Sequence, residues 1–393
     1  MAKVKGNGVF HRLYVGTGAF DIIGKRKRWY VVFGVILLIS IASIGIKQFN
    51  LGIDFVGGTK IQMPSTSSSG PISVESVKST FTKALGEDAT AVQSVGVGDT
   101  ATIQIRSETL NVEQVTKLKN TLDSDLKPTG GLQSISDSAV SASWGGEITT
   151  KALIALIVFL IAVAIFLALY FELSMAIAAL IAVLHDVIIT AGVYSLIGFE
   201  VSPATVIGLL TILGFSLYDT VVVFDKVKEN TRGILGLTRR TYGEAANLAV
   251  NQTLMRSINT SLIALLPVLG LLVIGVGFLG VGTLKDLALV QLTGIFIGAL
   301  SSIYIATPAA VDLKMRDPKY KAQAKRVLDR RNSQARKLAA GQTVDDTVES
   351  TDEAVVDAEI RKEKAYATAA GVPSRTPKAA DLRRGRPTGK KQR

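Results

Sequence analysis

Long apolar runs divide this chain into membrane-sized segments. Each run holds about 20 consecutive, mostly apolar residues, the number that a helix needs to cross a hydrocarbon core roughly 30 Å thick. Core helices and strands of soluble domains are built from shorter, periodic patterns. The sequence therefore predicts a membrane all-α bundle, with transmembrane helices at residues 29–47, 152–171, 174–197, 203–223, 254–275 and 285–307.

The first run follows a basic stretch at residues 25–28 and begins with Trp29 and Tyr30. A secretory signal peptide also starts with basic residues, but no small-x-small cleavage site follows this run. Aromatic residues gather at the headgroups of a bilayer, and basic residues stay on the cytoplasmic side. We therefore expect a retained first helix, with residues 1–28 as a cytoplasmic N-terminal segment.

Residues 50–148 have the mixed polar and apolar character of a folded domain outside the bilayer. Ser73 is placed to cap a helix, and Gly98-Asp99 is placed to close a hairpin. The predicted β-α-β-β-α-β order is that of the ferredoxin-like motif, so we expect an α+β ferredoxin-like extracytoplasmic domain between the first two transmembrane helices. Its expected strands are residues 52–63, 91–97, 100–106 and 132–143, and its expected helices are residues 73–85 and 111–126.

Composition and charge agree with this topology. Of the 393 residues, 48% are hydrophobic, and the mean hydropathy is +0.36. The formal charge of +12 is unevenly spread, because no Lys or Arg occurs from Ala152 to Phe224, whereas the chain ends and residues 225–253 are rich in both. By the positive-inside rule, we expect a cytoplasmic loop at 225–253 and a basic, largely disordered cytoplasmic tail at 311–393, whose early part is a candidate polar helix.

This distribution argues against nucleic acid as a partner and makes the basic tail a candidate for contact with anionic lipids. The sequence has no cysteine and only two histidines, which excludes disulfides and thiolate chemistry and disfavours a metal site. Gly57-Gly58 is not a phosphate loop, because no Lys-Ser/Thr follows it; adjacent glycines here indicate a turn or bulge. We expect no metal, no cofactor and no enzymatic activity.

Within the predicted spans, four ionisable residues at three places are candidates for function, because such groups are costly there and usually functional. His185 and Asp186 lie almost at the midpoint of the third span. Asp219 lies a few residues from the centre of the fourth, and Arg256 lies just inside the cytoplasmic end of the fifth. Neighbouring helix positions point about 100° apart, so His185 and Asp186 should not share one partner face.

Three of the four also have a structural interpretation. Arg256 could be a snorkelling residue at a helix end, and Asp186 a protonated group that holds helices together by hydrogen bonds. For His185 a structural hydrogen bond is favoured over proton transfer. Asp219 is harder to explain in this way, because a carboxylate has no long stem with which to reach water. Polar residues that accompany Asp219 and Arg256 on their helices are Ser216, Gln252, Thr253, Asn259 and Thr260.

Five segments of the chain resemble, in the same order, the SecD/SecF family of protein-export membrane proteins. The first carries Asp54, Gly57 and Gly58, and the second is similar to the intramembrane His-Asp motif of the SecF members. Tyr218 departs from the family pattern, which usually has Asn before the Asp. The segments are LGIDFVGGT at residues 51–59, LHDV at 184–187, LTILGFSLYDTVVVFDKVKEN at 210–230, NQTLMRSINTS at 251–261 and SSIYIATP at 301–308.

The resemblance, which covers about residues 20–310, implies half of a transporter of the RND superfamily in the bacterial cytoplasmic (inner) membrane. It implies a SecD partner with a similar half, a complex with the SecYEG channel, and translocating preproteins as clients. It also implies that the proton-motive force is used with SecD to assist late steps of protein export. On this resemblance Asp219 and Arg256 match a charged pair in the proton path, with Asp186 and His185 as further proton-relay candidates.

Two other functions stay open at this point. The chain could be half of an RND-type exporter of small molecules or lipids, or a passive factor for translocon assembly. Exporters of that type carry much larger porter domains than residues 50–148 can form. The intramembrane charges at Asp219 and Arg256 count against a passive factor.

Overall fold

The structure is a computed structural model that describes residues 20–68, 70–96, 98–278 and 282–340. These residues form two compact units. The first contains the described residues up to Thr231 and the segment Tyr242–Pro318, and the second contains Arg232–Thr241 and the described residues from Lys319 onward.

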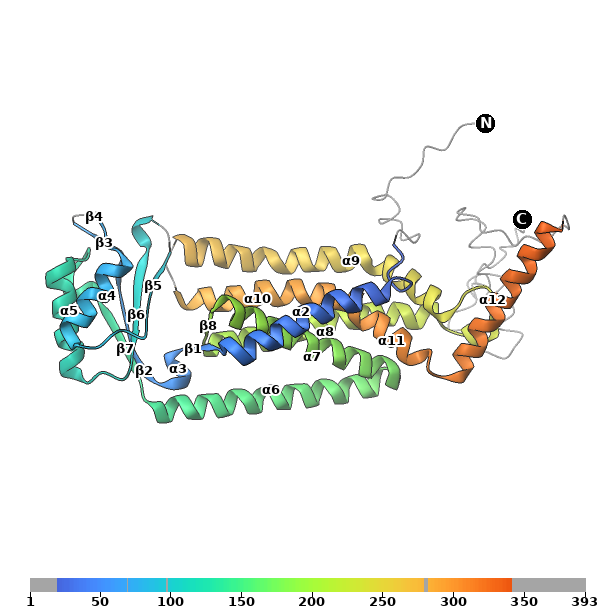
Figure 1. Cartoon of the computed structure of the whole chain (residues 1–393), viewed down its shortest axis with the longest axis horizontal. Coiled ribbons are helices and arrows are strands. Elements are labelled where there is room, and N and C mark those ends of the chain that lie inside the picture. The colour runs from blue at the N-terminus through green and yellow to red at the C-terminus, as the bar shows by residue number, and fades with distance from the viewer. Residues whose placement is uncertain (1–19, 69, 97, 279–281, 341–393) are drawn as a thin grey trace, which may run out of the picture. The chain divides into compact units, whose positions relative to one another are not determined.

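Six helical segments in the described part of the chain are long and apolar enough to cross a membrane, which confirms the predicted helical bundle. Figure 1 shows the long helices of the first unit lying side by side. Two of them continue through π-helical segments, Leu271–Phe278 after α9 and Ser302–Ala306 after α10, and the latter leads into α11 (Thr307–Lys314). The long helices are α2 (Arg26–Lys47), α6 (Ala142–Tyr170), α7 (Leu173–Ile197), α8 (Pro203–Asn230), α9 (Tyr242–Gly270) and α10 (Gly282–Ser301).

Two helices start earlier than the hydropathy predicted. Helix α6 begins at Ala142 instead of 152, because Ser141 caps it by accepting a hydrogen bond from the Trp144 amide at 3.3 Å. Helix α9 begins at Tyr242 instead of 254, and α8 runs on to Asn230, so the connection between them is much shorter than the predicted loop 225–253. Apolar runs mark only the part of a helix that lies in lipid, and these ends are polar.

The polar start of α9 is stabilised by tertiary hydrogen bonds that hydropathy does not register. Asn251 Oδ1 accepts from the Phe20 amide at 2.9 Å, and Asn247 Oδ1 accepts from the Ile22 amide at 2.8 Å. The segment before α2 is thereby tied to the first turns of α9.

The residues between α2 and α6 form a four-stranded antiparallel sheet in the order β5-β6-β2-β7. Helices α4 (Val74–Leu85) and α5 (Val112–Leu126) pack on it through buried side chains such as Phe81 and Leu118. Ser73 caps α4 as predicted, and Asn111 forms a capping box with Gln114 at the start of α5. The strands are β2 (Gly58–Pro64), β5 (Ala91–Val95), β6 (Thr102–Ser107) and β7 (Ser136–Val140), and β3 (Thr66–Ser67) and β4 (Gly70–Pro71) form a small separate ladder.

The first predicted strand, residues 52–63, is interrupted. Residues Ile53–Val56 form a short helix, α3, and the sheet begins only at Gly58. Gly57 and Gly58 have φ angles of +81° and +130°, which L side chains rarely adopt. A Cβ on Gly57 would lie 2.8 Å from the Ala142 backbone, and one on Gly58 would lie 2.6 Å from the Ser107 carbonyl oxygen. At the predicted turn the backbone of Gly57 and Gly58 therefore approaches the backbones of Ala142 and Ser107 so closely that only glycine fits.

The last predicted strand, residues 132–143, is shorter at both ends. A 3₁₀ turn at Gly131–Ser134 precedes β7, and α6 follows at Ala142. The Ser141 cap again explains the end of the strand, since it starts a helix at Ala142, just before the predicted end of the strand.

A buried ion pair joins this domain to the bundle. Strand β1 (Asn50–Leu51) pairs in parallel with β8 (Glu200–Val201), which connects α7 to α8. Beside this ladder Arg106 of β6 lies 3.6 Å from Glu200, and both side chains are less than a tenth exposed. Arg106 also donates to the Leu51 carbonyl oxygen at 3.1 Å and to Asn50 Oδ1 at 2.8 Å. The domain is thus anchored to the α7–α8 connection by charge as well as by backbone hydrogen bonds.

The second unit consists of α12 (Pro318–Ala339) and the segment Arg232–Thr241. Gln323 donates to the carbonyl oxygens of Leu237 and Arg240 at 3.0 and 2.8 Å, and Arg326 donates to that of Leu235 at 2.9 Å. The early part of the predicted tail is therefore helical. The disorder predicted for the rest of the tail concerns residues 341–393, which lie outside the described residues, as do residues 1–19 of the predicted N-terminal segment.

Candidate functional site

Asp186 lies in the core of the bundle, where its side chain is 1% exposed. Its Oδ2 accepts hydrogen bonds from Ser216 Oγ of α8 at 2.5 Å and from Ser301 Oγ of α10 at 2.7 Å. Its Oδ1 lies 3.0 Å from Nδ1 of His185. Asp186 therefore connects three helices, and contrary to the expectation of separate faces, the two neighbours contact each other.

Asp219 is the second buried carboxylate, and it is 2% exposed. Its Oδ2 accepts from Ser302 Oγ at 2.5 Å. Ser216, which we expected to lie close to the face of Asp219, donates instead to Asp186. The Asp186 carboxylate is thus bound by two serine hydroxyls and lies beside His185, and the Asp219 carboxylate is bound by the hydroxyl of Ser302.

Ser301 and Ser302 were missed as site residues by the sequence analysis, although they open the last of the segments that resemble the family. Both are fully buried. The signal in the sequence was a pair of adjacent hydroxyl residues within an apolar span, which lipid cannot satisfy. They lie where α10 passes into a π-helical segment, and such segments occur frequently at functional sites.

Arg256 does not form an ion pair with Asp219. Its side chain is exposed on α9, and within the described ranges no carboxylate lies within 4 Å of it. Gln252 and Asn259 are also exposed on α9, whereas Thr253 is buried. The predicted polar stripe is therefore split between two sides of the helix: Gln252 Oε1 accepts from Asn230 Nδ2 at 3.0 Å, Thr253 donates to the Ala249 carbonyl oxygen at 3.0 Å, and Thr260 donates to the Arg256 carbonyl oxygen at 2.8 Å.

Four buried polar atoms beside the candidate residues have no hydrogen-bond partner within the described part of the structure. They are Nε2 of His185, Oγ1 of Thr190, Oγ1 of Thr220 and Oγ of Ser257. Thr190 lies one helical turn after Asp186, and Thr220 follows Asp219 directly. Buried polar atoms normally have a partner in protein or water, so these mark polar positions within the apolar bundle.

Tyr218 is the position at which the resemblance led us to expect Asn. Its side chain is 48% exposed, whereas the neighbouring Asp219 is buried. The hydroxyl that binds Asp219 comes from Ser302. Tyr218 therefore does not take over an orienting role toward this carboxylate.

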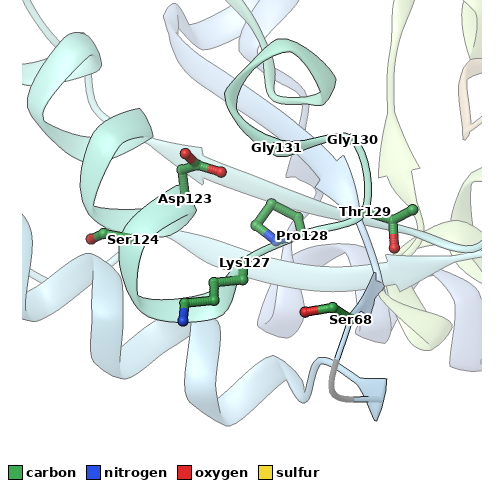
Figure 2. Close-up of a pocket in the computed structure, with 8 residues that line it drawn as sticks. All are labelled: Ser68, Asp123, Ser124, Lys127, Pro128, Thr129, Gly130 and Gly131. Atoms are coloured by element: carbon green, nitrogen blue, oxygen red, sulfur yellow. The ribbon is translucent and has the colours of Figure 1, made fainter.

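The remaining sequence candidates and surface features contain no further chemistry of this kind. Asp54 belongs to the short helix α3, outside the long helices. Among the residues that the structure describes, no three His, Cys, Asp or Glu side chains are grouped to hold a metal ion. Figure 2 shows a pocket in the α+β domain, formed around the turn that follows α5 and distant in sequence from the buried carboxylates. It is lined by Ser68, Asp123, Ser124, Lys127, Pro128, Thr129, Gly130 and Gly131.

Taken together, the core of the bundle holds two ionisable carboxyl groups, each bound by serine hydroxyls. This arrangement can bind and release protons.

Comparison with known proteins gives matches along most of the chain. Residues 121–316 match the family model described as "Protein export membrane protein SecD/SecF, C-terminal", and residues 42–68 match the "SecD/SecF GG Motif". The second match contains Gly57 and Gly58, whose backbone geometry is described above.

Curated relatives agree with these models. The chain is 55% identical over 337 residues to the protein translocase subunit SecF of Mycobacterium tuberculosis (strain H37Rv), covering 84% of this chain and 75% of that protein. It is 42% identical over 381 residues to the subunit SecF of Streptomyces coelicolor, covering 97% and 98%. It is also 34% identical over 302 residues to the subunit SecDF of Thermus thermophilus, covering 76% of this chain and 39% of that protein.

A solved structure of similar fold is the crystal structure of SecDF from Thermus thermophilus, described there as a translocon-associated membrane protein. It superposes with a TM-score of 0.65 at 33% identity, over 75% of this chain and 38% of that chain. This chain therefore spans well under half of that relative. Six helices among the described residues are long and apolar enough to span a membrane, and the relatives are translocase subunits. The chain is therefore a multi-pass membrane protein and an accessory subunit of a protein translocase, and it belongs to the SecD/SecF family of protein-export membrane proteins.

Proposed function

We propose that this chain pairs with a SecD partner and uses the proton-motive force to assist late steps of protein export through the SecYEG channel. The observation that carries the proposal is the pair of carboxylates, Asp186 and Asp219, each buried in the bundle and bound by hydroxyls. A carboxyl group in such surroundings is costly and is usually retained for ion movement. Moving one charge through 100 mV supplies about 2.3 kcal/mol, which is enough to bias a conformational cycle.

The exposed polar side chains of α9 are evidence for a second six-helix half that packs against this chain. Arg256, Gln252 and Asn259 lie exposed on a helix that is otherwise apolar enough to span a membrane. Lipid offers such groups no hydrogen bonds, so a second six-helix half should cover them. The Thermus thermophilus relative carries the name SecDF, and this chain matches 39% of it, which supports SecD as the partner. In that complex we expect Arg256 to approach Asp219 during the proton cycle.

We propose that the domain between α2 and α6 belongs to the ferredoxin-like class and lies on the extracytoplasmic side. The strand order β5-β6-β2-β7 with both helices on one face supports the class. The positive-inside rule supports the side, since the basic segments lie at the chain ends and between α8 and α9. In this orientation α12 and the segment Arg232–Thr241 are cytoplasmic, and the basic tail is available to anionic lipids of the inner membrane.

The orientation is testable because the chain has no cysteine of its own. Ser68 and Ser333 are both exposed, so single cysteines at these positions are accessible to reagents. A membrane-impermeant thiol reagent should label Ser68→Cys in intact, wall-permeable cells, but should label Ser333→Cys only after the membrane is opened. Labelling of Ser333→Cys in sealed cells would contradict the proposed topology.

The function itself is tested by late translocation into sealed inverted vesicles that contain SecYEG, at saturating ATP, with and without a proton gradient. We expect the gradient to accelerate completion of export several-fold when this chain and SecD are both present. Vesicles lacking this chain should lose that acceleration and keep ATP-driven initiation. An identical response to the gradient with and without the chain would refute the proposal and favour a passive assembly factor.

A further inference from the structure

Two consecutive serines bind the two buried carboxylates. Ser301 Oγ lies 2.7 Å from Asp186 Oδ2, and Ser302 Oγ lies 2.5 Å from Asp219 Oδ2. Adjacent positions of a helix point about 100° apart, which allows one short segment to reach α7 and α8 at once. The segment lies at the passage from α10 to the π-helical turn Ser302–Ala306.

Each serine hydroxyl has a second acceptor on its own helix. Ser301 Oγ lies 3.2 Å from the Gly298 carbonyl oxygen, and Ser302 Oγ lies 3.1 Å from the Ala299 carbonyl oxygen. A hydroxyl carries one proton and two lone pairs. It can therefore donate to the carboxylate or to the carbonyl, but not fully to both.

The two acceptors correspond to the two protonation states of the carboxyl group. When Asp219 is ionised, Ser302 donates to it. When Asp219 is protonated, its O–H can donate to Ser302 Oγ, whose own proton turns to the Ala299 carbonyl oxygen. In both states the Ser302 hydroxyl and the Asp219 oxygen that faces it keep each other as partners, and an unpaired buried polar group is what makes such a change costly. The same alternatives exist for Ser301 between Asp186 and Gly298.

We infer that Ser301 and Ser302 are positioning residues that solvate both protonation states of Asp186 and Asp219. The inference rests on the proposed proton function. It adds a mechanism by which the buried core of the bundle can tolerate the change of charge when Asp186 or Asp219 gains or loses a proton. Because the two serines are neighbours, a rotation of this segment moves both hydroxyls together. The protonation of the two carboxyl groups is then coupled through the segment that lies between them.

The test compares Ser302→Ala with Ser302→Thr, which keeps a hydroxyl, in the complex with SecD. Ser261→Ala serves as the matched control, since Ser261 is a buried serine of α9 that donates to the Ser257 carbonyl oxygen. The measurement is the gradient-dependent part of late export in sealed vesicles as a function of pH. Ser302→Ala should move this profile by about one unit to higher pH, because the ionised carboxylate loses a donor. Ser302→Thr and Ser261→Ala should keep the parental profile.

An infrared titration of the purified chain separates this inference from the proposed function, because it needs no export. The carboxyl C=O band that is absent from Asp219→Asn reports Asp219, and it should shift in frequency in Ser302→Ala but not in Ser302→Thr. If Ser302→Ala does not assemble, Ser302→Cys replaces it, with a smaller shift expected because a thiol is a weak donor. A parental band and a parental pH profile in the alanine variant, or equal changes in the alanine and threonine variants, would overturn the inference. A gradient response that is identical with and without this chain would instead overturn the proposed function.

Discussion

Replacing Asp219 by asparagine is expected to abolish the gradient-dependent part of late export while leaving ATP-driven export intact. Asparagine keeps the volume of the side chain and can still accept a hydrogen bond from Ser302, whose Oγ lies 2.5 Å from the carboxylate. It cannot take up and release a proton. Burying a neutral amide is also less costly than burying a charge, so the variant should fold and bind its partner normally. The measurement is late translocation into sealed vesicles with and without a proton gradient.

The matched control is Asp225→Asn on the same helix. Asp225 is exposed, and its carboxylate lies 3.5 Å from the Tyr170 hydroxyl near the end of the spanning region. This variant should respond to the gradient as the parent does. If Asp219→Asn also keeps the parental response, proton uptake takes place elsewhere, and Asp186 becomes the next group to replace.

Replacing Arg256 in the same vesicle assay tests the other member of the predicted charged pair. Because the guanidinium is exposed and unpaired with Asp219 in the isolated chain, its role depends on a rearrangement or on the partner half. Arg256→Lys should keep only part of the gradient-dependent export, since an ammonium lacks the planar fork of a guanidinium and loses its proton more readily in apolar surroundings.

Replacing Glu200 by glutamine is expected to lower the free energy of unfolding more than replacing an exposed partner of an ion pair in the same domain. Arg106 and Glu200 lie 3.6 Å apart with 6% and 8% of their side chains exposed. Removing one charge of such a pair leaves the other buried without compensation, which destabilises proteins by about 3–5 kcal/mol. Thermal unfolding of the purified full chain, followed by circular dichroism, should show a Tm lower by several degrees. Proteolysis at the junction around Asn50 should become faster.

An exposed ion pair in the same domain provides the control. Lys83 donates to Asp125 at 2.7 Å and thereby holds the pKa of that carboxyl below its ordinary value. Solvent screens this pair, so Asp125→Asn should leave the Tm close to that of the parent. The double replacement Arg106→Met and Glu200→Leu should recover most of the stability lost in Glu200→Gln, because it removes both charges. A loss in Glu200→Gln no larger than that in Asp125→Asn would show that the junction does not depend on this pair.

Features that depend on near neighbours in the chain were predictable from the sequence. Apolar run length located all six spanning helices, because crossing a bilayer requires about 20 such residues in succession. Ser73 marked the start of α4, because a cap acts on amides two or three residues away. The ionisable residues Asp186 and Asp219 were identified as candidates because charge is costly in lipid wherever the helix packs.

The tertiary structure alone decided which groups meet. Ser216 and Ser301 lie 30 and 115 positions from Asp186, which both of them bind, and no periodicity relates residues at such separations. The contact between Arg106 and Glu200 likewise joins residues that are far apart in the sequence. The side of α9 on which Arg256 lies was also not predictable from periodicity. Helix propensity and hydropathy act over a few residues, whereas hydrogen-bond partners are fixed by how separate helices pack and rotate against one another. The sequence by itself thus determined the spans and the candidate carboxylates, and the fold determined the hydroxyls that bind them.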